Sequence, residues 1–223
     1  MKSIVFQIVL GFLLSILIFL GMLSGAIQKT SSNQEYYFEK FEENNISQVT
    51  GKTKAELNHI GKDLIKYLKT GENNLLEKYF NQREILHMED VYQLMVLNKM
   101  IWYIFLIFII PGFYVFYRLG GTWKELFVSN LFLLFLLLLF FGIISLNFSK
   151  AFIIFHKIFF QNDLWILNPE TDLMIQMLPE NFFEGMAKKI GILVLLGQLI
   201  YMIILSLGKA GFFGKNSLYR RFL

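Results

Sequence analysis

Four long apolar stretches dominate this sequence and restrict the folds that the chain can adopt. They cover residues 4–27, 97–117, 126–146 and 190–207, and each is long enough to cross the roughly 30 Å hydrocarbon layer of a bilayer as a helix. Hydrophobic residues make up 55% of the chain, whereas about 45–50% is usual in soluble domains. The sequence therefore predicts an all-α membrane protein with four transmembrane helices. The first stretch is longer than a signal-peptide core, so we expect an uncleaved anchor.

Charge indicates how these stretches are oriented in the membrane. Four spans place the polar segments 28–96 and 147–189 on one side of the membrane and both termini on the other. Basic residues gather at the N-terminus, in the short turn 118–125 and in the tail 208–223, whereas all 17 Asp and Glu residues except Glu125 lie in the two long polar segments. The positive-inside rule then predicts cytoplasmic termini and a small, mainly helical extracytoplasmic domain built from the two polar segments.

The first polar segment carries clear helix signals. Thr53 and Glu56 form a capping-box pattern before an apolar row at helical spacing, and Gly71 ends that row. From about Arg83 a further helix is predicted to run without a break into the second span. Residues 34–48, rich in aromatic side chains, are expected to be extended or irregular.

The second polar segment follows the third span directly. A short helix is predicted around His156, followed by a loop over residues 161–170. Helices are expected over residues 172–177 and 179–189, on either side of a break at Pro179.

Two of the three histidines fall where chemistry at a membrane surface is expected. His87 lies about ten residues before the second span, and His156 lies about nine residues after the third, within the apolar run FIIFHKIFF. Both therefore belong to the same side of the membrane, near the depth of lipid ester carbonyls. A pair of imidazoles at that level can supply general acid–base catalysis near neutral pH. His59 lies in the amphipathic helix and is expected to be structural or solvated.

Further polar side chains accompany these two histidines. Asp90 lies one helical turn after the first histidine, where it can orient the ring or raise its pKa. Asn162, Asp163 and Trp165 follow the second histidine within a few residues and can support it likewise, although Trp165 also fits an interfacial aromatic. Arg83 is expected either to bind an anionic group or to pair with a nearby glutamate. An unremarkable surface role for each of these residues stays open.

Several classes of function are disfavoured by composition. The chain has no cysteine, which excludes disulfides, thiolate metal sites and thioester catalysis. Its two outer histidines and scattered carboxylates lack the spacing of a metal site, so we expect no metal and no cofactor. A transporter is disfavoured because the spans contain almost no ionisable groups and a single proline, Pro111. A non-enzymatic accessory or sensor protein with an extracytoplasmic domain remains the alternative to an enzyme.

The motif HMEDV at His87–Val91 and the run FHKIFFQNDLWILNPETDLMIQMLPENFF at Phe155–Phe183, placed outside a four-span frame, resemble the lipoprotein intramolecular transacylase (Lit) family of Gram-positive bacteria. The resemblance covers essentially the whole chain. It implies an enzyme that moves the sn-2 acyl chain of a diacylglyceryl-cysteine lipoprotein to the α-amino group of the same cysteine, giving the lyso form. In that family the two outer histidines are regarded as catalytic, and they correspond here to His87 and His156.

This resemblance implies a diacylated lipoprotein substrate in contact with membrane lipid, a multi-pass protein of the cell membrane and an active site on the extracellular face. We expect no nucleic-acid partner and a monomer. In the mechanism that we expect, His156 removes the proton of the attacking amine, and His87, supported by Asp90, donates to the oxyanion or to the leaving oxygen. The reverse assignment of the two histidines stays open.

Overall fold

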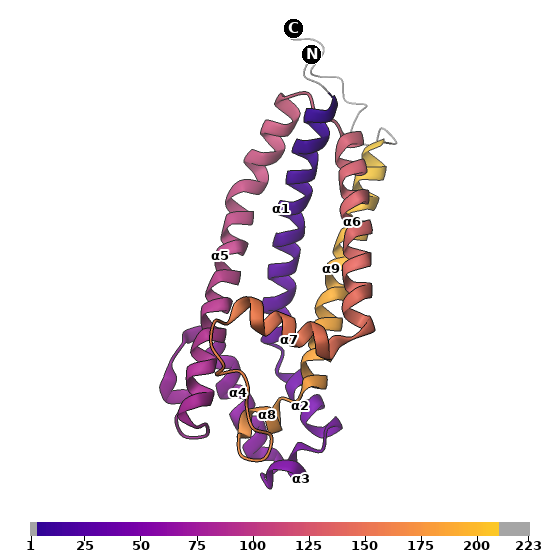
Figure 1. The fold of residues 1–223 in the computed structure, drawn as a ribbon. Helices are drawn as coiled ribbons and strands as arrows, with labels where there is room; N and C mark the ends of the chain where they lie inside the picture. Colours follow the sequence, from indigo (N-terminus) through magenta and orange to yellow (C-terminus); the bar gives the residue numbers. More distant parts are fainter. Residues whose placement is uncertain (1–3, 210–223) are drawn as a thin grey trace. The chain divides into compact units, whose positions relative to one another are not determined.

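The computed structural model describes residues 4–209, and in that range all regular elements are helices (Figure 1). The prediction of an all-α fold is confirmed. The helices are α1 (Ile4–Ser31), α2 (Gln34–Glu43), α3 (Ile46–Thr50), α4 (Lys54–Thr70), the 3-10 turn η1 (Asn73–Leu75), α5 (Gln82–Arg118), α6 (Trp123–Leu146), α7 (Phe148–Phe159), α8 (Leu173–Met177) and α9 (Glu180–Lys209).

The chain forms two compact units. The membrane unit comprises, within the described range, residues 4–25, 101–143 and 191–209, and the polar unit comprises residues 26–100 and 144–190. The part of the predicted cytoplasmic tail beyond residue 209 lies outside the described residues.

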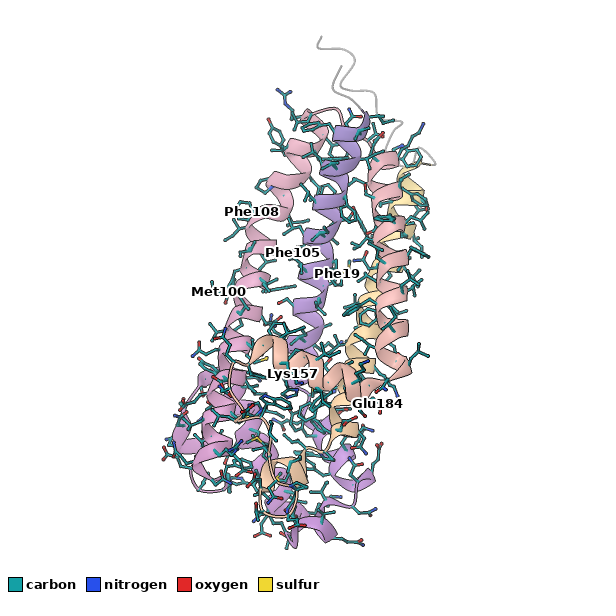
Figure 2. All side chains as sticks on the ribbon, in the orientation of Figure 1. Phe19, Met100, Phe105, Phe108, Lys157 and Glu184 are labelled. Atoms are coloured by element: carbon teal, nitrogen blue, oxygen red, sulfur yellow. The ribbon has the colours of Figure 1, made fainter. Side chains whose placement is uncertain are left out.

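The membrane unit is built from parts of α1, α5, α6 and α9, which are long and apolar enough to cross a membrane. Each of the four predicted spans falls within one of these helices. The apolar core of the membrane unit contains Leu14, Phe116 and Leu126. Figure 2 shows Phe105 between α5 and α1 and Phe108 on the opposite side of α5, where it is exposed as expected for a side chain in lipid.

Close helix packing in the membrane unit depends on a glycine. A Cβ at Gly21 of α1 would come within 2.4 Å of the ring of Phe105 on α5. Only a residue without a side chain allows this approach, as is common where membrane helices pack.

The helix caps that the sequence predicts for α4 are present in the polar unit. The Thr53 side chain accepts from the Glu56 backbone N–H, and the Glu56 side chain accepts from the Thr53 N–H, which completes the capping box of α4. Gly71 ends α4 with φ of +73°, and a Cβ there would lie 2.6 Å from the ring of Tyr92.

The expectation of an extended or irregular chain over residues 34–48 is wrong, because α2 and α3 occupy most of it. Asn33 caps α2 by accepting from the Tyr36 N–H. Tyr36, Tyr37 and Phe41 then form a buried helical face. Aromatic residues prefer strands only weakly, and burial of this face in the core of the unit decides the conformation.

One apolar core holds α2, α4, α8 and the beginnings of α5 and α9 together in the polar unit. Leu64, Tyr67, Leu76 and Phe182 are among its most buried side chains. The Tyr36 hydroxyl donates to the Phe182 carbonyl oxygen over 2.5 Å. α5 runs unbroken from Gln82, as predicted, so the core fixes the end of the helix that carries His87.

Candidate active site

His87 and His156 lie together inside the polar unit. His87 on α5 and His156 on α7 have ring centroids 6.1 Å apart, with their planes inclined by 32°. Both side chains are buried, with 8% and 7% of their surface exposed. The structure therefore brings together the two residues that the sequence singles out, while their catalytic role stays a prediction.

Aromatic rings enclose the pair. The centroid of Phe160 lies 5.2 Å from that of His87 and 5.4 Å from that of His156. Phe152 and Trp165 contact His156 at centroid distances of 4.3 and 4.9 Å. These rings replace water around the imidazoles and lower the local dielectric, which strengthens electrostatic interactions with any group that enters.

A backbone contact fixes the tautomer of His156. Its Nδ1 lies 2.7 Å from the carbonyl oxygen of Phe152, one turn earlier in α7. A carbonyl can only accept, so Nδ1 carries the proton and donates it. In the neutral ring the lone pair then resides on Nε2, which is the arrangement required of a general base.

Burial keeps both imidazoles neutral at physiological pH. Desolvation, reinforced by the neighbouring His156, lowers the pKa of His87 from its ordinary 6.5 to about 4, and the Asp90 carboxylate opposes this only in part. Desolvation also lowers the pKa of His156, against the opposing effect of its hydrogen bond to Phe152. Asp90 thus raises the pKa of His87, as expected, but desolvation outweighs this effect and the net pKa is lowered.

The depressed pKa of His87 predicts a stability that falls in mild acid. Between the ordinary value of 6.5 and about 4, the unfolded chain binds a proton that folded His87 does not bind, so the free energy of unfolding decreases as the pH falls through this window. We expect a loss on the order of 1 kcal/mol from His87 between about pH 7.5 and 5.5. Thermal unfolding in detergent measures it, and His87→Gln should reduce the slope. A melting temperature equal at both pH values would contradict the prediction.

The loop after α7 is held across α5 on both sides of His87. The Arg83 guanidinium donates to the backbone carbonyl of Asp163, and Asn162 Nδ2 donates to the Asp90 carboxylate over 2.9 Å. These α5 residues flank His87, one turn before it and one turn after it. The loop consequently carries Trp165 onto the ring of His156.

These contacts show what each suggested supporting residue touches, while the supporting roles stay predictions. Asp90 pairs with Asn162 and acts on His87 through its charge. Trp165 contacts His156 directly, whereas Asp163 contributes its carbonyl to the loop anchor. Arg83 contacts that carbonyl, so the expected pairing with a glutamate is not what the structure shows.

A buried carboxylate that the sequence does not single out is Glu84, which is 1% exposed. Its carboxylate accepts from the backbone N–H groups of Asn81 and Met174, each over 2.7 Å, and so ties the start of α5 to α8. Burial raises its pKa, while these two N–H groups oppose the shift. The Asn81 side chain accepts from the Glu84 N–H in return. The motif N-x-x-E is a capping-box signal in the sequence that predicts this arrangement.

His59 is exposed and lies 3.6 Å from Asp63 in α4. This placement agrees with the solvated role that the sequence predicts. Among residues 4–209, no group of three or more His, Asp or Glu side chains is arranged to hold a metal ion.

The fold and the site together define a polytopic helical membrane protein with a buried histidine pair in its polar unit. The family profile described as "Lipoprotein intramolecular transacylase Lit" matches residues 12–183. The chain therefore belongs to the Lit family of membrane acyltransferases.

Solved structures share this fold. The chain is similar to the membrane integral lipoprotein intramolecular transacylase Lit from Bacillus cereus, with a TM-score of 0.76 and 24% identity over 93% of this chain and 98% of that one. Two variants of that protein, in which one histidine is replaced by arginine or by alanine, match with a TM-score of 0.74 and 23% identity over 92% of this chain. They match over 94% and 96% of their own chains. A comparison with curated protein sequences found no match.

Proposed function

We propose that His87 and His156 catalyse the transfer of the sn-2 acyl chain of a diacylglyceryl-cysteine lipoprotein to the α-amino group of the same cysteine, the reaction of the Lit family. The observation that carries this proposal is the pair of buried, neutral imidazoles 6.1 Å apart in the polar unit. The variants of the Bacillus cereus protein, each altered at one histidine, are consistent with this emphasis on histidine. A non-enzymatic accessory or sensor protein is not favoured by the family match.

The reaction needs little covalent chemistry from the protein. The nucleophilic amine and the ester belong to one molecule, so holding them face to face supplies much of the rate, up to about 7–11 kcal/mol in well-oriented systems. No acyl-enzyme is required, and the absence of cysteine in the chain fits this route. The apolar walls around the histidines would receive the glyceryl and acyl portions of the substrate.

A proton path through His156 balances the reaction. The neutral amine attacks the sn-2 carbonyl and forms an N–C bond, and Nε2 of His156 takes the proton that the amine must lose. Collapse of the tetrahedral intermediate breaks the bond between the carbonyl carbon and the sn-2 oxygen, and the same proton passes to that oxygen to give the glycerol hydroxyl. Neutral His87 donates an N–H hydrogen bond to the oxyanion meanwhile. Both groups end in their starting protonation states.

We place the polar unit on the extracellular face and both termini in the cytoplasm, from the charge bias of the sequence. A chain without cysteine makes this testable by single substitutions. Glu170→Cys, in an exposed loop of the polar unit, should react with a membrane-impermeant maleimide on intact cells. Lys124→Cys, at an exposed position in the first turn of α6, should react only after lysis. The opposite labelling pattern would invert the topology.

The activity is tested by mass spectrometry of a reporter lipoprotein made in a host with and without this chain. The acyl transfer conserves mass, so fragmentation must show whether an acyl chain has moved from the glyceryl group to the cysteine nitrogen. We expect the N-acylated, lyso form only with the chain present.

We propose a monomer as the active unit.

A further inference from the structure

A hollow in the polar unit adjoins the histidine pair. It has a volume of about 570 Å³ and is formed by α7 and the loop after it. Ile153, Phe160, Trp165 and Ile166 supply its apolar surface, and its two charged groups are Lys157, labelled on α7 in Figure 2, and Asp163.

The hollow shares two walls with the candidate active site. Phe160 lines it and contacts both imidazole rings, while Trp165 lines it and contacts His156. A ligand in the hollow would therefore lie beside the histidine pair. This position suits a group of the substrate that is joined to the reacting ester by a few bonds.

The charged groups of the hollow are free to bind a ligand. Within residues 4–209, neither the Asp163 carboxylate nor the Lys157 ammonium has a hydrogen-bond or ion-pair partner. The backbone of Asp163 is nevertheless fixed, because its carbonyl accepts from Arg83, and the preceding Asn162 is bound to Asp90. Asp163 thus presents a carboxylate without a partner on an anchored loop.

We propose, resting on the function above, that Asp163 binds the α-ammonium group of the lipid-modified cysteine and so recognises substrates with a free N-terminus. An α-amino group has a pKa of about 7.7–8.0 and is largely protonated at neutral pH, so it requires an anionic acceptor before it docks. Lys157 supplies a donor for carbonyl oxygens of the same molecule, and the apolar surface accepts its glyceryl portion. Asp163 is a binding residue here: the ammonium first releases one proton to solvent, and the neutral amine that attacks loses its second proton to His156.

The test separates binding from catalysis. A synthetic lipopeptide with ether-linked chains in place of the esters cannot transfer an acyl group, and it is prepared with a free or an N-acetylated cysteine. We expect the wild-type protein to bind the free amine up to roughly fivefold more tightly, the scale of an ion pair at an exposed carboxylate. Asp163→Asn should remove most of this preference, because it keeps the shape and the backbone carbonyl but not the charge. Glu170→Gln, in the same loop but outside the hollow, should retain it.

Each outcome decides one claim. Equal affinity of the wild-type protein for both lipopeptides, or an unchanged preference in Asp163→Asn, would overturn the ammonium site. Vesicles of phosphatidylethanolamine supply the same ammonium chemistry from a membrane lipid, and competition by them as strong as that of the free-amine lipopeptide would also overturn it. Failure of the wild-type protein to convert the ester form of the lipopeptide would instead overturn the proposed function, whatever the binding data show.

Discussion

Alanine in place of either histidine of the pair should greatly reduce the rate at which the lyso lipoprotein forms. Removing His156 leaves the amine without a base, and removing His87 leaves the developing oxyanion without its donor. General acid–base catalysis contributes about 10²- to 10⁴-fold, so we expect a loss of that size in each single variant. Because both residues act on one proton transfer and one intermediate, the double variant should lose far less than the product of the two single losses. Initial rates on a diacyl lipopeptide in detergent measure these effects.

His59→Ala is the matched control for the histidine variants. His59 is exposed, lies beside Asp63 and belongs to the same unit, so its removal should leave the rate unchanged. Membrane insertion and thermal unfolding of each variant show whether the protein still folds. Full activity in folded His87→Ala or His156→Ala would exclude a catalytic pair.

Loss of the Glu84 carboxylate should destabilise the polar unit strongly. Glu84→Ala leaves the backbone N–H groups of Asn81 and Met174 without their acceptor. The Met174 contact is buried, and an unsatisfied buried donor costs about 1–3 kcal/mol, to which the lost helix cap adds. We therefore expect the free energy of unfolding to fall by about 2–4 kcal/mol, measured by thermal or denaturant unfolding in detergent.

A graded series makes the Glu84 prediction specific. Glu84→Gln retains one oxygen acceptor and should lose roughly half as much stability as the alanine variant. Glu77→Ala removes an exposed carboxylate nearby in the chain and should change stability by less than about 0.5 kcal/mol. Equal stability of Glu84→Ala and Glu77→Ala would show that the carboxylate does not hold α5 to α8.

Local signals in the sequence predict much of the fold. The spans follow from length and hydropathy, α4 from its capping box and terminal glycine, and the unbroken α5 from the absence of a breaker before Pro111. α2 could not be predicted in this way. The helical conformation of α2 depends on Phe182, which lies far along the chain. The carbonyl of Phe182 accepts a hydrogen bond from the Tyr36 hydroxyl, and the ring of Phe182 packs against the ring of Tyr36.

In the candidate site, too, some features can be predicted from the sequence and others depend on contacts between distant parts of the chain. The meeting of His87 and His156 could be expected, because membrane topology alone puts both on one side of the bilayer. The sign of the pKa shift of His87 could not, since it depends on desolvation by rings that come from α7 and from the residue after it. Asp90 lies one helical turn from His87, but its hydrogen-bond partner, Asn162, comes from a loop that only the folded chain brings to α5.

Isotope crossover with purified protein tests the central claim most directly. One diacyl lipopeptide carries a heavy sn-2 acyl chain and a heavy peptide, a second carries both in light form, and the two are mixed with the protein. Fragmentation of the products should find heavy acyl chains only on heavy cysteines and light chains only on light cysteines, with product from His156→Ala reduced at least about a hundredfold. Products that combine a heavy acyl chain with a light peptide, or product formation independent of the histidine, would contradict an intramolecular transfer catalysed by this pair.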